Sequence, residues 1–317
     1  MNVFSTKSLA VASAVALSLG AAASANATAL AQSTLQVNNI LFQNATGTAT
    51  LDASAFDVLT IQDSTNLNPS LNNVFNPFST FTVGGAPLGM HTVCVPVDCT
   101  SLNQPTPYAD ATVPPTANGS LASSNLTGAP ITGLGQPTGA TAQTEALSEL
   151  VDPGVANSAA NLGLIASFSF STTTDQAVRI TFDTIAHEIA YLDSLFTANT
   201  GIGWTLDISI HNGANVFHWA PDGVIGTGIT GGTEQADGCN LQVSRGVVGP
   251  GTNSYDCTGR ETATTGILFA NTTYDLTLSH QVRSDVLVGA VPEPATLALL
   301  GLGLVGVAGL GMRRKTN

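Results

Sequence analysis

Charge is the scarcest property of this sequence. Only 9% of its 317 residues are Asp, Glu, Lys or Arg, against about 25% in ordinary soluble domains. Between positions 26 and 290 there is no lysine, and the formal charge of that span is −16. Its few cations could not neutralise a run of phosphates, which excludes a nucleic-acid-binding protein. The four bases of the span are Arg179, Arg245, Arg260 and Arg283.

The same span lacks long helices and the short motifs of common enzymes. No amphipathic segment exceeds two or three turns, and residues 143–150 form the best short helix candidate. There is no G-x-S-x-G and no phosphate-binding loop, so the nucleophile elbow of a hydrolase has no support. An apolar content of 43% nevertheless excludes an ordinary disordered chain and allows a sizeable core.

The N-terminus has the order of a secretory signal. Lys7 precedes an apolar run over residues 9–23, and small residues follow at Ala23, Ala25 and Ala27. This order predicts a signal peptide over residues 1–27, cut by signal peptidase after Ala25 or Ala27 following Sec export. A later cut after Ala31 and an uncleaved membrane anchor are the alternatives.

The C-terminus has the order of a membrane segment with a basic stop. Residues 295–312 are uncharged, and as a helix they would span about 27 Å, close to the roughly 30 Å hydrocarbon core of a bilayer. The basic cluster Arg313, Arg314 and Lys315 follows and should stay cytoplasmic. The body, residues 28–290, is then expected outside the inner membrane.

Pro292, Glu293 and Pro294 stand directly before that apolar run. This order of Pro-Glu-Pro, short apolar helix and terminal basic cluster resembles the PEP-CTERM sorting tail of Gram-negative bacteria, over residues 291–317. The resemblance implies that exosortase, an integral-membrane cysteine transpeptidase, recognises the Pro-Glu-Pro element and processes the chain near it. It also implies that the basic cluster is the stop-transfer element. A plain tail anchor is the alternative.

Alternating apolar and polar residues dominate the body and predict strands. Residues 177–183, 203–211 and 273–279 alternate most clearly, and Asn212-Gly213 predicts a hairpin turn. These patterns favour an all-β body, an antiparallel β-sandwich or jelly-roll-like fold. Further strand candidates are residues 34–42, 56–61, 78–83 and 164–170.

Residues 100–141 interrupt the strand pattern. They are rich in Pro, Gly, Thr, Ser and Asn, including six prolines. We expect a long loop within one β body there, with a linker between two sub-domains as the alternative.

The four cysteines, in an exported chain, predict disulfides. Three pairings are open, and we favour the local ones, Cys94–Cys99 and Cys239–Cys257. A zinc site is disfavoured because no C-x-x-C occurs.

The histidines give weak signals for chemistry. His187-Glu188 begins like H-E-x-x-H, but position 191 is Tyr and the segment alternates as a strand. His280 shares the apolar face of its strand with Leu276 and Leu278. His218, Trp219 and Asp222 are candidates for a sugar-binding groove, with an internally packed hairpin as the alternative.

Calcium is the most reasonable ion to propose for so acidic a body. Asp222-Gly223 and residues 234–238 are the candidate loops, although no D-x-D-x-D-G series is present. We assign no metal ligand and expect no resident cofactor.

Together these features predict an exported, non-enzymatic surface or extracellular-matrix protein that is held briefly in the inner membrane. The family resemblance implies an association with exopolysaccharide and biofilm. The alternative is a carbohydrate-binding module or a glycan-acting hydrolase at the cell surface.

Overall fold

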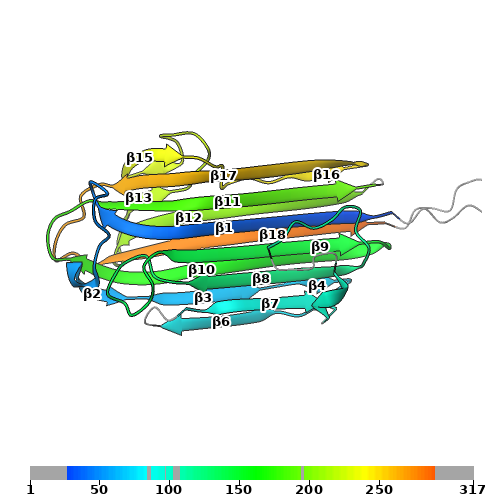
Figure 1. The fold of residues 1–317 in the computed structure, drawn as a ribbon, viewed down its shortest axis with the longest axis horizontal. Coiled ribbons are helices and arrows are strands. Elements are labelled where there is room, and N and C mark those ends of the chain that lie inside the picture. Colours follow the sequence, from blue (N-terminus) through cyan, green and yellow to red (C-terminus); the bar gives the residue numbers. More distant parts are fainter. Residues whose placement is uncertain (1–26, 84–86, 97, 103–107, 194–195, 290–317) are drawn as a thin grey trace, which may run out of the picture.

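The body of the protein is an antiparallel β-sandwich of long strands (Figure 1). The computed structural model describes residues 27–289 apart from 84–86, 97, 103–107 and 194–195. The signal peptide, except for its last residue, and the sorting tail over 291–317 lie outside these residues. The fold class predicted from alternation is confirmed as an all-β sandwich.

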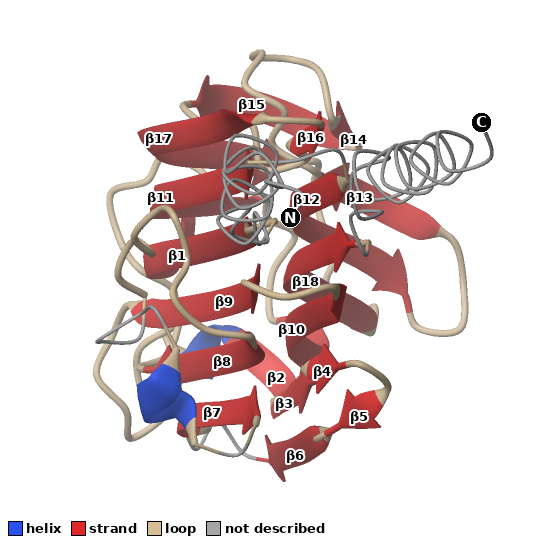
Figure 2. Ribbon diagram, turned by 90° about the vertical axis from the view of Figure 1, so that its right-hand side faces the viewer, coloured by secondary structure: helices blue, strands red, loops and turns tan. Residues whose placement is uncertain are grey.

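Two sheets face each other (Figure 2). The first sheet has seven strands, in the order β15 (Gly232–Asp237), β17 (Gly251–Thr265), β11 (Val178–Leu192), β1 (Ala29–Asn44), β9 (Ala140–Leu150), β8 (Gly119–Thr127) and β7 (Gly89–Val95). The main path of the second sheet is β14 (Ile229–Thr230), β13 (Asn215–Trp219), β12 (Thr197–Ile210), β18 (Tyr274–Val288), β10 (Gly154–Thr172), β3 (Gln62–Leu67) and β6 (Phe78–Val83).

Short strands extend the second sheet. β16 (Gly246–Val248) pairs with β12, β2 (Phe56–Thr60) and β4 (Ser70–Leu71) pair with β10, and β5 (Val74–Phe75) pairs with β4. The only helical elements in the described part of the chain are single 3-10 turns, η1 (Ala53–Ala55) and η2 (Cys99–Ser101).

Alternation decides which side chains enter the core. Trp204, Leu206 and Ile208 of β12 point inward and are at most 1% exposed, because every second residue of a strand points to the same face. The rings of Phe182, Trp204 and Trp219 lie 4.6–5.3 Å apart between the sheets. At this end of the sandwich the core is therefore aromatic.

Elsewhere the sheets meet through small polar side chains, which we call the serine seam: Ser33, Thr65, Ser120, Ser124, Ser148, Ser158 and Ser284. The hydroxyls of Ser148 and Ser284, from opposite sheets, lie 2.9 Å apart. Those of Thr65 and Ser124 lie 2.7 Å apart. Direct hydrogen bonds between sheets require close approach, which only small side chains allow.

Two sequence expectations about elements are wrong. Residues 143–150, the short helix candidate, lie in β9, which pairs with both β1 and β8. The range 100–141, expected as loop or linker, contains the nine-residue β8. Pairing on both sides overrides local propensity at these positions.

The segment between β7 and β8 packs on the outer face of the first sheet. The Gln32 amide donates to the Ala109 carbonyl (2.7 Å) and accepts from the Ala111 N–H (2.7 Å). The Tyr108 N–H donates to Glu145 Oε2 (2.9 Å). A small separate core forms beneath it from Leu30, Cys94, Leu102, Ala111, Leu121 and Leu147. The Pro-rich stretch thus covers a sheet face, with polar groups of the sheet as its partners.

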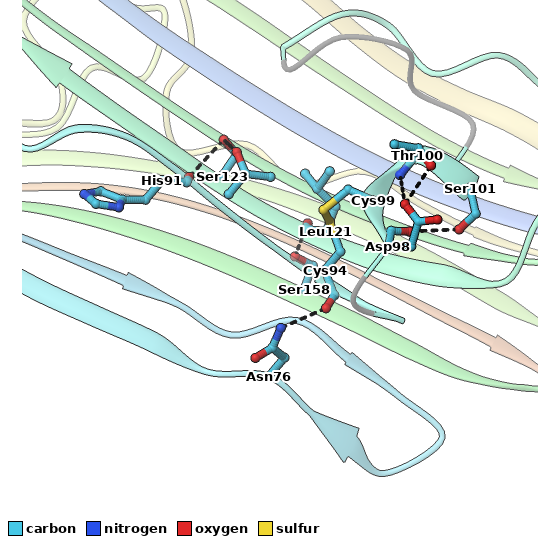
Figure 3. Close-up of a disulfide and its surroundings, with 11 residues drawn as sticks. Asn76, His91, Cys94, Asp98, Cys99, Thr100, Ser101, Leu121, Ser123 and Ser158 are labelled. Atoms are coloured by element: carbon cyan, nitrogen blue, oxygen red, sulfur yellow. Dashed lines mark hydrogen bonds between the residues drawn. A yellow bond between two sulfur atoms is a disulfide. The ribbon is translucent and has the colours of Figure 1, made fainter.

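Both disulfides have the predicted local pairing, Cys94–Cys99 and Cys239–Cys257. The first joins β7 to η2, and the Asp98 carboxylate caps that turn by accepting from the Thr100 N–H (2.9 Å) (Figure 3). The second joins the residues after β15 to β17 across an 18-residue separation. No free cysteine remains.

Candidate functional site

The three residues predicted to line a sugar groove do not lie together on one surface. Trp219 is fully buried, and its indole N–H donates to Glu234 Oε1 (2.6 Å). Its ring faces Phe182 and Trp204, so it cannot stack on a sugar. His218 points the other way, and its Nδ1 lies 2.7 Å from Asp207 Oδ1 on the outer face of the second sheet.

The two loops proposed for calcium do meet, but their carboxylates bind backbone. Asp237 Oδ2 accepts from the N–H groups of Asp222, Gly223 and Val224 at 2.9–3.1 Å. Asp222 itself accepts from the Thr227 hydroxyl. Within the described ranges, no group of three or more His, Cys, Asp or Glu side chains could hold a metal ion. The carboxylates therefore shape the turn.

Glu261 holds the adjoining disulfide loop in the same manner. Its carboxylate accepts from the Gly238 N–H (2.7 Å) and the Cys239 N–H (3.0 Å). Burial raises the pKa of Glu261 to about 7 and also raises the pKa of Asp237, although backbone donors oppose both shifts.

The remaining histidines predicted from the sequence are structural. His187 is half-buried on β11, with Nδ1 against the Asp256 carboxylate. His280 is fully buried, with Nε2 3.1 Å from the Leu35 carbonyl, and burial lowers its pKa to about 3. Neither lies in an H-E-x-x-H helix.

A polar cleft opens on the outer face of the second sheet, over β10, β18 and β12. Its volume is about 410 Å³. The register places Ala159, Arg283 and Gly201 on one rung, and Asn161, Gln281 and Gly203 on another. The strand-like segment 241–245 forms its far wall, bonded to β12 through Thr200, Ile202 and Trp204. Gln242 and Ser244 of that segment also line the cleft.

Two glycines let long polar side chains lie flat across β12. A Cβ at Gly201 would stand 2.6 Å from Arg283 Nε, and one at Gly203 would stand 2.8 Å from Gln281 Nε2. Any larger residue would displace these groups. Glycine inside a strand often marks such a close approach.

Most other charged and amide groups on this face are paired with one another. Asn199 donates to Asp285 (2.7 Å), and His211 lies 2.8 Å from Asp275. The cleft differs. The side chains of Asn161, Gln281 and Arg283 make no hydrogen bond to any residue that the structure describes. These three side chains therefore offer hydrogen-bonding groups to a ligand in the cleft.

The floor of the cleft is fixed from inside the sandwich. The Ser33 hydroxyl, from β1 in the opposite sheet, donates to the Arg283 carbonyl (2.7 Å) and accepts from the Gly201 N–H (3.2 Å). Glu188 lies beside Ser33 and is fully buried. Burial raises the pKa of Glu188 to about 7, and the Thr200 hydroxyl, Arg245 and Arg283 oppose that rise.

This cleft was not predicted from the sequence. Its residues come from four segments that are far apart along the chain. The available signal was the pair Gly201 and Gly203 at the outward positions of an otherwise well-formed strand.

The described body is thus a β-sandwich protein with a polar surface cleft over β10, β18 and β12, and the comparisons place a sorting motif at the C-terminal end of the chain. The model of the PEP-CTERM protein-sorting motif matches residues 290–315. The chain therefore carries a PEP-CTERM sorting motif, as the Pro-Glu-Pro order predicted. The match does not identify the family of the body. No curated protein matches the chain.

Solved structures give only remote likenesses. The T=1 particles derived from infectious bursal virus show 11% identity over 90% of this chain and 86% of that chain, with a TM-score of 0.11. The Cry4Aa toxin of Bacillus thuringiensis shows 8% identity over 82% and 52%, with a TM-score of 0.10. TM-scores this low carry no argument about the body.

The described residues contain no helix long and apolar enough to cross a membrane. The predicted transmembrane helix, 295–312, lies outside the described residues.

Proposed function

We propose that the protein is a non-enzymatic surface or extracellular-matrix protein, delivered through an exosortase-type transpeptidase and associated with extracellular polysaccharide. The sorting motif at residues 290–315 carries this proposal. The polar outer face of the sandwich, with its open cleft, supports a role in contact with a hydrated polymer. In this scheme the tail lodges in the inner membrane until it is processed near Pro292, Glu293 and Pro294.

The start of β1 supports the earlier signal-peptidase cuts. Ala29, Leu30 and Ala31 are paired with both β9 and β11. The Thr28 hydroxyl donates to Asp193 (2.7 Å). A cut after Ala31 would remove these contacts, so we assign cleavage after Ala25 or Ala27.

The sorting proposal is tested by deleting Arg313, Arg314 and Lys315. The truncated chain should lose membrane retention and processing, because the stop-transfer charges are gone. Cell fractionation and intact mass of the purified protein measure both. A control chain with Arg313→Lys and Arg314→Lys keeps the charge and should be sorted normally. Unchanged fractionation and C-terminal mass in the deletion would contradict the proposal.

The cleft favours a second function, carbohydrate binding at the cell surface. Planar amide and guanidinium groups suit the paired hydroxyls of sugars, and the −16 charge of the body repels polyanions. We therefore assign a neutral polysaccharide as ligand. None of the residues that line the cleft is Asp, Glu or His, so the site offers no acid–base pair for hydrolysis.

Affinity electrophoresis tests this binding directly. The exported protein should be retarded in gels that contain a neutral polymer, with xylan, galactomannan and β-glucan as probes and alginate as the anionic comparison. Arg283→Ala combined with Gln281→Ala should abolish the retardation. Thr277→Ala, exposed on the same strand and face, should leave it unchanged. Free migration in every neutral gel would remove the cleft as a glycan site and leave the sorting proposal intact.

A further inference from the structure

The charges of the body are distributed very unevenly along the chain. Residues 64–144 carry only two charged side chains, Asp98 and Asp110. Residues 145–289 carry fifteen acids and all four arginines of the body. One part of the sandwich is therefore almost neutral, while the other is strongly acidic.

The fold places the neutral stretch at one edge of both sheets. β6 ends the second sheet and β7 ends the first. Both lie at the bottom of the molecule in Figure 2, next to β8 of the same stretch and to β3, whose one charged residue, Asp63, is buried. The ring of Phe78, from β6, lies 4.9 Å from that of His91, from β7. The two edge strands thus form one continuous side of the sandwich.

The outermost strand of this side is apolar and exposed. Asn72 and Asn73, both with positive φ, turn β4 into β5, and the chain returns along β6. Phe81 and Val83 of β6 point to the outer face at 64% and 60% exposure. Phe75 of β5 is 68% exposed. No charged side chain interrupts residues 74–83.

Such an edge is normally protected. An edge strand offers a row of N–H and C=O groups to another chain, and soluble proteins block it with charges, bulges or proline. Here Pro77 interrupts the edge between β5 and β6, but β6 itself contains neither proline nor charge. The edge has the properties of a pairing surface.

We propose that the β6 edge pairs with the β6 edge of a second copy of this chain, around a twofold axis. Electrostatic repulsion between the acidic parts favours contact through the neutral side of each copy. Two bodies of charge −16 repel each other wherever their acidic parts meet, and the neutral edge is the surface on which they can approach. Residues 74–83 extend about 33 Å, and the two sheets, each about 10 Å thick, make the side about 20 Å wide. The interface is then on the order of 600 Å² per chain, near the usual 800 Å².

The pairing does not depend on the sorting or carbohydrate proposals. Sedimentation velocity of the exported, processed protein, in detergent-free buffer, should show a dimer that dissociates on dilution. Raising NaCl from 20 to 500 mM should tighten the dimer, because salt screens the repulsion between the acidic parts. A single-chain mass at every concentration and salt level would overturn the proposal, as would a dimer weakened by salt.

Charged substitutions locate the interface. Phe81→Lys combined with Val83→Lys should weaken dimerisation at least tenfold, since both side chains already face solvent and the strand can keep its fold. Val248→Lys, at an 86% exposed position on β16, is the matched control and should leave the dimer unchanged. Circular dichroism checks that all variants are folded. A dimer that survives the β6 double variant, or that Val248→Lys disrupts, would show that β6 is not the interface.

Discussion

Around Trp204 the two sheets are held by large aromatic rings, whereas around Ser148 they are joined by hydroxyl groups of small side chains. The aromatic end gains its stability from buried apolar area, which is insensitive to the exact direction of each contact. The serine seam depends on close approach and on directed hydrogen bonds. The polar cleft lies over the seam, where Ser33 fixes Arg283 and Gly201 from behind. The rung of Arg283 and Gly201 in the cleft is therefore held by directed hydrogen bonds from the serine seam.

The largest loss is expected at the aromatic end. Trp204→Ala should lower the free energy of unfolding by about 3–5 kcal/mol, because it leaves a large cavity against Phe182 and Trp219. Urea denaturation measures this loss. Trp219→Phe should cost more than Trp204→Phe, since only the Trp219 indole has a carboxylate partner within the described residues. Equal losses for the two Phe variants would contradict this assignment.

The disulfides should come next. Cys239→Ser with Cys257→Ser should cost about 3 kcal/mol, and Cys94→Ser with Cys99→Ser about 2 kcal/mol, because the longer loop restricts the unfolded chain more. Melting of each double variant against the unchanged protein provides the measurement. A larger loss from the shorter loop would show that its stabilising effect comes from the packing around η2.

The stability of the serine seam should be lowered more by a larger side chain than by the loss of a hydroxyl group. Ser148→Leu adds apolar volume where Ser284 faces it from the other sheet, and it should cost about 2 kcal/mol through overpacking. Ser148→Ala removes the hydroxyl that hydrogen-bonds to Ser284 and should cost about 1 kcal/mol. If the leucine variant were the more stable of the two, the sheets would not be in close contact at this position.

The smallest effect is the pH dependence of stability that comes from Glu188, which lies beside Ser33 of the serine seam. The pKa of Glu188 is raised by burial to about 7, so the folded state binds a proton that the unfolded chain releases near pH 4.5. The resulting stability is complete below pH 4.5 and is lost as pH rises through 7. Glu188→Gln should therefore be more stable than the unchanged protein by about 1 kcal/mol at pH 8, with no advantage at pH 4.5. Thermal melting at the two pH values tests this.

His280 provides an opposite pH dependence as a control. Burial depresses the pKa of His280 to about 3, so the unfolded chain takes up the proton first as pH falls below 6.5. The corresponding stability is present above pH 6.5 and is lost toward pH 3. Both proteins carry His280, so its contribution cancels in their difference, and a stability difference that does not grow from pH 4.5 to pH 8 would show that the assignment to Glu188 is wrong.

Alternation in the sequence predicted the strands that build the core. Val178, Ile180 and Phe182 point inward as expected, and Asn212 adopts positive φ in the predicted hairpin. Residues 143–150 were missed because Ala, Gln, Glu and Leu favour a helix locally, and only pairing with β1 and β8 reveals the strand.

The site was harder to predict because it is assembled across strands. Asn161, Gly201 and Arg283 are neighbours only in the folded sheet. The alternation of Phe217, His218 and Trp219 could have shown that Trp219 points inward with Phe217. The sorting tail was recognisable because its three parts are contiguous, so no tertiary contact is needed to define it.

The first strand begins and the last strand finishes at the same end of the sandwich, on the right in Figure 1. Ala29 lies opposite Leu150 and Leu192, and Val288 lies opposite Gly154. Residues 290–294 can extend at most about 18 Å. While the proposed tail is inserted in the inner membrane, the end of the sandwich that holds Ala29 and Val288 must lie close to the lipid headgroups. The hairpin at His211, at the opposite end, must then point away from the membrane. Until it is released, the newly exported molecule would thus expose the same end, that of the His211 hairpin, on the side away from the membrane.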